Sequence, residues 1–173
     1  MEDVPKTWDA YYDFLKDVQK RLRAQGMRNV YAIGFQLNTT GNDSNVRFND
    51  FIIAYGGQDI VTPDGKLHLY EPTVREAALK ALIYPTTAYK QGFVPPEAIN
   101  WNDADDNNAF HAKQIVVDIE RSLSTEVAII KNQQDYKDIV TMRLPLSPPR
   151  SGISRRSPRM LCLRPLAGPP RFS

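Results

Sequence analysis

Residues 29–35 read NVYAIGF, a short apolar stretch that is rich in strand-forming residues and has polar residues before and after it. A run of this length and composition predicts a buried β-strand. It follows residues 8–22, where apolar side chains recur at helical spacing and give the helix one face to bury. A helix followed by a buried strand is a unit of α/β folds, and the pattern recurs along the chain. We therefore predict the α/β class.

Local signals mark where the elements begin and end. Thr7 is the expected N-cap of the first helix, and Gly26 is its natural stop. Residues 63–65, Pro-Asp-Gly, predict a hairpin turn. Pro85 is expected to kink or end the helix that runs over residues 71–81. Further strands are expected at 59–62, 66–69 and 114–119. A second helix is expected to end at Gly56, and a further helical stretch follows Pro85 up to residue 90. The last two expected helices are at 104–113 and 124–131.

Charge and proline content divide the chain near residue 142. Residues 143–173 hold seven of the 22 basic residues, all of them arginine, none of the 20 acidic residues, and seven of the 13 prolines. Residues 1–142 therefore keep 15 basic and 20 acidic residues, a net charge of −5. Because proline removes backbone donors and like charges repel, we predict that residues 146–173 form no packed element. The expected organisation is a folded region, residues 1–142, and a disordered tail, residues 143–173.

The arginine-rich tail has two interpretations. A basic segment can bind nucleic acid or anionic lipid through their phosphates. The alternative is a tail translated out of frame from a GC-rich gene. Residues 1–142 use nine lysines and six arginines, whereas the tail uses arginine alone. This abrupt change favours the out-of-frame interpretation, so no nucleic-acid partner is expected.

Several function classes are excluded or disfavoured by composition. The sequence has no run of about 18 apolar residues that would cross a membrane, and its first thirty residues lack the basic-then-apolar pattern of an export signal. A single cysteine, Cys162, excludes an intramolecular disulfide framework and a cysteine metal cage. His68 and His111 have no serine, cysteine or carboxylate at suggestive spacing. We therefore expect no enzymatic activity, no cofactor and no metal.

A polar loop at residues 100–108 places one large aromatic residue, Trp101, among many hydrogen-bonding side chains. An EF-hand calcium loop does not fit, because asparagine occupies the glycine position and Gln114 the glutamate position. A sugar can pack on an indole and pair its hydroxyls with carboxylates and amides. The alternative is structural: Asp103 caps the following helix, and Trp101 belongs to the core. The spacing of these residues, taken alone, favours the interpretation of Asp103 as a helix cap. The candidate ligand-binding residues of this loop are Trp101, Asn102, Asp103, Asn107 and Asn108.

A second polar loop, residues 38–45, offers the same choice. Asn42 and Asp43 precede or open a helix, where free backbone N–H groups and amide side chains can meet a polar ligand. A flexible turn with a capping side chain explains the sequence equally well. Both interpretations stay open at this point.

Several short motifs follow one another along the chain: PKTWD at 5–9, YGG at 55–57, PDGK at 63–66, EPTVREAA at 71–78, GFVPP at 92–96, WND at 101–103 and NAF at 108–110. Their order resembles that of bacterial extracellular solute-binding proteins, and within them the maltose-binding-like sugar-binding components of ABC importers. The resemblance covers residues 3–142. Residues 119–121, Ile-Glu-Arg, stand where that family often has an Asp-Gly or Gly-Trp turn beside the ligand.

The resemblance implies a function in sugar transport. Such proteins have two α/β lobes that close on a sugar and deliver it to permease subunits, so this chain is expected to be one lobe of that fold. Trp101 would be the stacking platform, Asn102, Asp103, Asn107 and Asn108 would supply hydrogen bonds, and Asn42 and Asp43 would face them from the other loop. The family location is the periplasm. With no export signal in this chain, a cytoplasmic location is expected if it is expressed as it stands. A chain with one lobe is expected to be truncated and impaired in binding.

An interaction protein is the alternative function. In that case a free-standing protein reuses the lobe, and the basic tail binds an anionic partner.

Overall fold

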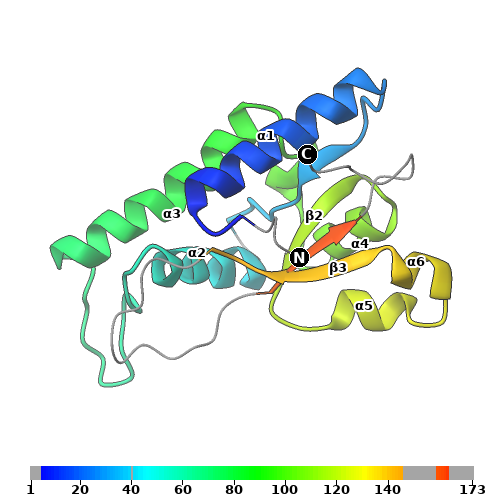
Figure 1. The fold of residues 1–173 in the computed structure, drawn as a ribbon. Helices are drawn as coiled ribbons and strands as arrows, with labels where there is room; N and C mark the ends of the chain where they lie inside the picture. Colours follow the sequence, from blue (N-terminus) through cyan, green and yellow to red (C-terminus); the bar gives the residue numbers. More distant parts are fainter. Residues whose placement is uncertain (1–4, 40, 146–158, 164–173) are drawn as a thin grey trace.

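The computed structural model describes residues 5–39, 41–145 and 159–163, and in these ranges the fold is mixed α/β, as predicted (Figure 1). A four-stranded sheet has the order β1-β2-β4-β3. The strands β1 and β2 are parallel, while β4 is antiparallel to both β2 and β3. The strands are β1 (Tyr31–Ile33), β2 (Ile115–Glu120), β3 (Ile139–Arg143) and β4 (Arg159–Leu163).

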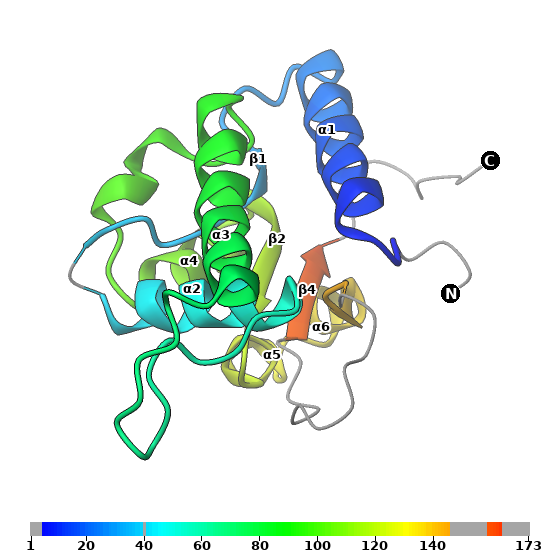
Figure 2. The ribbon, with the colours of Figure 1, turned by 90° about the vertical axis from the view of Figure 1, so that its left-hand side faces the viewer.

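Helices cover the sheet. In both Figure 1 and Figure 2, α1 and α3 lie on one side of the molecule, and α5 and α6 lie on the opposite side. None of the helices in the described ranges is long and apolar enough to cross a membrane. The helices are α1 (Trp8–Ala24), α2 (Asn42–Ala54), α3 (Pro72–Lys90), α4 (Asp105–His111), α5 (Ser124–Ile129), α6 (Gln133–Lys137) and a 3-10 turn, η1 (Pro96–Asn100).

The first helix forms for the reasons that its sequence indicates. The Thr7 hydroxyl accepts the N–H of Ala10 at 3.2 Å and so satisfies one of the free donors of the first turn. Gly26 adopts a positive φ of 75° just past the helix end. The apolar face of α1 packs into an aromatic cluster, where the ring of Trp8 lies 5.4 Å from that of Phe51 and 5.2 Å from that of Tyr84. Both predicted boundary signals of α1 are confirmed.

Two local predictions need correction. The prediction that Pro85 ends the helix is wrong, because α3 continues through it to Lys90, where a helical stretch was expected to reach. It continues because its buried face extends past the proline, to Ala88, and because the Thr86 hydroxyl donates to the Leu82 carbonyl at 2.6 Å within the disturbed turn. The predicted hairpin around residues 63–65 has the turn, but its flanks form a single bridge, Val61 to Leu67, in place of two strands.

The largest correction concerns the tail. Residues 159–163 form β4, which pairs on one edge with β2 and on the other with β3. The prediction that no packed element forms in residues 146–173 is therefore wrong for these five residues. Their sequence, RMLCL, is mostly apolar, and the arginine and proline content of the whole tail concealed this short stretch. Residues 146–158 and 164–173 lie outside the described residues.

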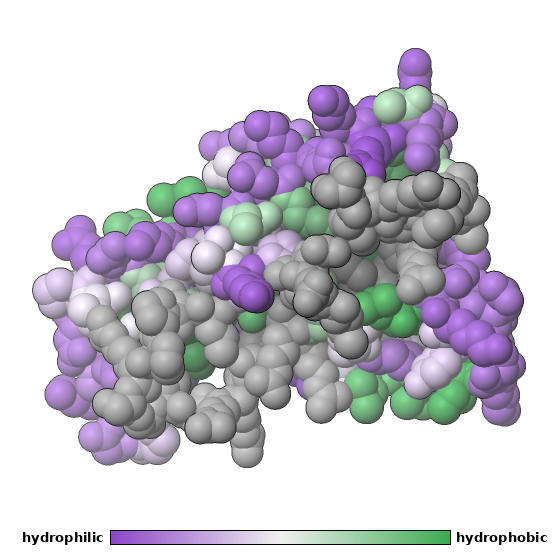
Figure 3. Space-filling view, viewed as in Figure 1, coloured by the Kyte–Doolittle hydropathy of each residue, from purple (hydrophilic) through white to green (hydrophobic). Residues whose placement is uncertain are grey.

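Figure 3 shows that the surface over α1 is largely hydrophilic, whereas hydrophobic residues gather along the lower edge of the molecule, near α5. Three exposed apolar side chains, Leu123, Val127 and Ile130, belong to α5 and its flanking residues. The core itself is formed by the sheet and by the buried faces of α1, α2, α3 and α4.

Candidate functional site

The candidate site lies at one edge of the sheet, where the two parallel strands end. Residues 34–41 follow the carboxyl end of β1 and lead into α2, and β2 ends at Glu120. Because β1 and β2 are parallel, their carboxyl ends meet at the same edge. In α/β folds this edge is where ligands usually bind.

The two polar loops that the sequence singled out are in direct contact at this edge. The side-chain amide of Asn38 donates to the Trp101 carbonyl, and its oxygen accepts the N–H of Gly41 at 2.8 Å. A Cβ atom at Gly41 would lie 2.7 Å from Asn38 Oδ1 and 2.8 Å from Asp103 Oδ1, so this junction has room for glycine and not for a side chain. The fold therefore brings the two loops together at the carboxyl ends of β1 and β2.

Asp103 has a different structural role from the one predicted for it. The helix α4 starts at Asp105, and its N-cap residue, Ala104, makes no side-chain capping bond. Asp103 instead accepts the N–H of Asp43, in the first turn of α2, at 3.1 Å. A carboxylate is favourable at this end of a helix, because the helix dipole is positive there. The prediction that Asp103 caps its own helix is wrong: it caps α2 from the neighbouring loop.

Trp101 lies in the core and is 7% exposed. A Cβ atom at Gly34 would lie 3.2 Å from Cζ3 of the indole, so the ring packs close to the backbone that follows β1. Stacking a sugar requires an exposed aromatic face. The buried position favours the structural interpretation of Trp101 over the stacking platform.

The remaining predicted site residues divide between surface and interior. The side chains of Asn102, Asn108 and Asn42 are exposed, and Asp43 is half-buried. Asn107 is half-buried, and its side-chain amide lies against two carboxylates, 3.0 Å from Glu120 Oε1 and 3.3 Å from Asp118 Oδ2. The structure therefore brings Asn42, Asp43, Asn102 and Asp103 to one edge and places Asn107 in a separate cluster.

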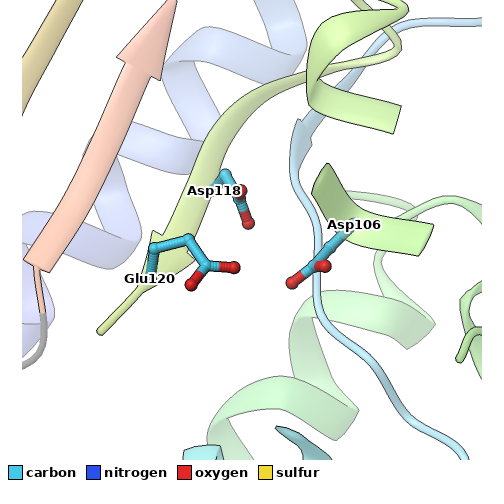
Figure 4. A group of neighbouring side chains, drawn as sticks. All are labelled: Asp106, Asp118 and Glu120. Atoms are coloured by element: carbon cyan, nitrogen blue, oxygen red, sulfur yellow. The ribbon is translucent and has the colours of Figure 1, made fainter. Parts of the chain in front are cut away.

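Those carboxylates form a buried group that the sequence analysis missed. Asp106 comes from α4, and Asp118 and Glu120 come from β2 and face it (Figure 4). One oxygen from each of the three residues can be chosen so that all lie within 4.8 Å of one another. Asp106 and Asp118 have no exposed surface, and Glu120 is 7% exposed. We call these three residues the carboxylate cluster.

Arg47, from α2, is the basic side chain that lies against this cluster. Its Nη2 atom is 3.0 Å from Asp106 Oδ2 and 3.5 Å from Glu120 Oε1, and the arginine is itself buried. Burial raises the pKa of all three acids, and for Asp118 the neighbouring Asp106 raises it further, to well above the usual range. Burial lowers the pKa of Arg47, but the three acids outweigh that effect and raise it.

The sequence did contain a signal for this cluster. Residues 115–120 read IVVDIE, and alternate residues of a strand point to the same face. Asp118 and Glu120 are therefore two acids on one face of an otherwise apolar strand, which is an expensive arrangement unless it has partners. Asp106 and Arg47 could not be assigned as those partners without the fold, because they lie far away in sequence.

Arg121, at the end of β2, forms an ion pair with an acid. Its Nε atom lies 2.7 Å from Asp50 Oδ2, and its Nη2 atom pairs with Asp50 Oδ1. Asp50 is buried, whereas the arginine side chain is 51% exposed. The ion pair neutralises Arg121 at the end of β2.

Comparisons with protein-family models, with curated proteins and with solved structures give no match to this chain.

Proposed function

We propose that this chain is a sugar-binding lobe of the extracellular solute-binding type and acts as the substrate-binding component of an ABC sugar importer. The observation that carries the proposal is the contact between the two polar loops at the carboxyl edge of β1 and β2, made by Asn38, Gly41 and Asp103. Ligand sites of α/β folds are found at this edge. The motif order described above agrees with this class.

The groups at this edge suit a neutral sugar. Each sugar hydroxyl both donates and accepts, so it pairs with carboxylates as acceptors and with amides as either. Asp43 and Asp103 provide carboxylate oxygens, Asn42 and Asn102 provide exposed amides, and the first turn of α2 adds backbone N–H groups. The ion pair of Arg121 with Asp50 keeps an uncompensated positive charge away from the edge, which favours a neutral ligand over an anionic one.

Trp101 has a supporting function in this proposal. Its indole is buried beside Gly34, and its carbonyl accepts the Asn38 amide. Binding then depends on hydrogen bonds at an open edge, and without a stacked ring we expect it to be weak, with a dissociation constant of about 1 mM or higher. The proposed partners are the sugar and ABC permease subunits, and the proposed event is binding without chemical change.

A panel of neutral monosaccharides and oligosaccharides, titrated into the full chain by calorimetry or ligand-observed NMR, tests this proposal. We expect weak, saturable binding of at least one sugar, reduced about tenfold or more in Asn102→Ala and Asp103→Ala, because each removes a hydrogen-bonding group at the edge. Asp17→Ala, on the exposed surface of α1, is the matched control and should bind like the parent chain. Equal binding by all three variants would exclude this edge as the site.

A further inference from the structure

Among the residues that the structure describes, the carboxylate cluster has more negative charge than the basic side chain beside it neutralises. Asp106, Asp118 and Glu120 would contribute three negative charges when ionised, and Arg47 contributes one positive charge. The pair of Asp50 with Arg121 is already balanced. Burying an uncompensated charge is costly, so the cluster requires protons or a further cation. A divalent cation would bring the sum of these charges to zero.

An unused oxygen atom in the cluster points to a cation as the ligand. Asp118 has no exposed surface, its Oδ1 atom has no hydrogen-bond partner among the described residues, and its carboxyl group points toward Asp106 in Figure 4. Arg47 contacts one oxygen of Asp106 and one of Glu120, and the other oxygen of Asp106 accepts the backbone N–H of Asn107 at 2.8 Å. Because each carboxylate oxygen has two lone pairs, these contacts leave acceptor capacity on both acids.

Asn107 adds a fourth group to the same space. One terminal atom of its amide lies 3.0 Å from Glu120 Oε1 and 3.3 Å from Asp118 Oδ2. As the amide nitrogen, that atom donates to both acids and also lies 2.8 Å from the Thr125 hydroxyl.

We propose that Asp106, Asp118 and Glu120 form a site for a hard divalent cation such as Ca²⁺ or Mg²⁺. Carboxylate oxygens are among the ligands that these ions prefer. Oxygens on opposite sides of a Ca²⁺ ion lie about 4.6–5.2 Å apart, given bond lengths of 2.3–2.6 Å, so a cluster within 4.8 Å needs little rearrangement. The cation enters beside Glu120, the most exposed of the three acids.

Such a cation has a structural consequence at the proposed sugar edge. It ties α4 to β2 directly behind that edge, and Glu120 adjoins Arg121, where β2 ends. Cation binding therefore stabilises the fold and fixes the end of β2. The cation site does not depend on sugar binding at the edge.

Calorimetric titration of CaCl₂, and separately of MgCl₂, into the chelator-treated full chain tests the proposal, with thermal unfolding as a second readout. We expect one cation per chain and a rise in melting temperature with the bound ion. Asp118→Asn should weaken binding at least tenfold, and Glu120→Gln should weaken it as well. Asp17→Asn, at an exposed ion pair on α1, is the matched control and should bind like the parent.

The near-isosteric Asp118→Asn change also separates lost binding from lost folding. Without a cation it replaces one of three crowded buried acids by a neutral amide, so we expect this variant to remain folded by circular dichroism and to melt no lower than the parent in chelator. If it does not fold, Glu120→Gln at the cluster's more exposed side carries the test. The proposal is overturned if neither ion binds the folded parent at about 10 mM, tenfold above the weakest extracellular Ca²⁺ sites, or if binding persists in both variants. Neither result depends on the sugar titrations.

Discussion

At the scale of single residues, one arginine in α1 and one in α2 illustrate how burial determines the contribution of an ion pair to stability. Arg47 is buried against Asp106 and Glu120, whereas Arg21 pairs with Asp17 at side chains that are more than half exposed. Solvent screens the exposed pair, and an exposed pair typically contributes about 1 kcal/mol or less. Removing one partner of a buried pair leaves an uncompensated charge and costs much more.

We predict that Arg47→Met lowers the free energy of unfolding by about 3–5 kcal/mol, because it leaves three buried carboxyl groups without their arginine. Arg21→Met, which removes the same charge from the surface of α1, should change it by about 1 kcal/mol or less. Urea denaturation of both variants measures the difference. Losses of similar size would show that Arg47 is not buried as described.

Trp101 gives a second prediction at this scale. Because the indole packs in the core beside Gly34, Trp101→Ala should lower the free energy of unfolding by about 3–5 kcal/mol, as large core truncations do. Truncating the 40% exposed Tyr136 to alanine is the control and should cost far less. A Trp101→Ala variant that keeps its stability and loses sugar binding would restore the stacking-platform interpretation.

At the scale of elements, the sequence predicted helices and the first two strands because their signals are local. The apolar spacing around Tyr11, the Thr7 cap and the Gly26 stop determine α1 without reference to the rest of the chain. The strand β4 depends on pairing with β2 and β3, and its five residues lie in a region whose average composition predicts disorder. The same holds for the candidate site. The sequence predicts the two polar loops, because their composition is a local signal, but it does not predict that they contact each other.

The position of β4 changes the effect on stability that we expect when the tail is shortened. A disordered tail could be removed at little cost, but β4 lies between β2 and β3, so its loss leaves two strand edges unpaired. We predict that a chain ending at residue 158 loses cooperative thermal unfolding or aggregates, as judged by circular dichroism and light scattering. A chain ending at residue 163 retains β4 and is the matched control. Equal melting curves for the two shortened chains would contradict the strand assignment.

At the scale of the whole molecule, one sheet connects the proposed binding edge to the C-terminal strands. The strand β2 pairs with β1, which leads into the polar loops, and also with β4. Behind the edge, α2 and α4 are linked through Arg47 and Asp106. A ligand at the edge therefore contacts loops that are anchored to the rest of the fold, and such anchoring keeps the polar groups in place.

Backbone amide NMR spectra of the full chain, recorded during titration with the best-binding neutral sugar of the panel, test the central claim most directly. We predict concentration-dependent shifts that cluster at Asn42, Asp43, Asn102 and Asp103, with a dissociation constant of about 1 mM or higher. Asp103→Ala should remove these shifts, because it deletes a carboxylate of the edge and the cap of α2. Shifts confined to other parts of the fold, or none for any sugar of the panel, would contradict the account.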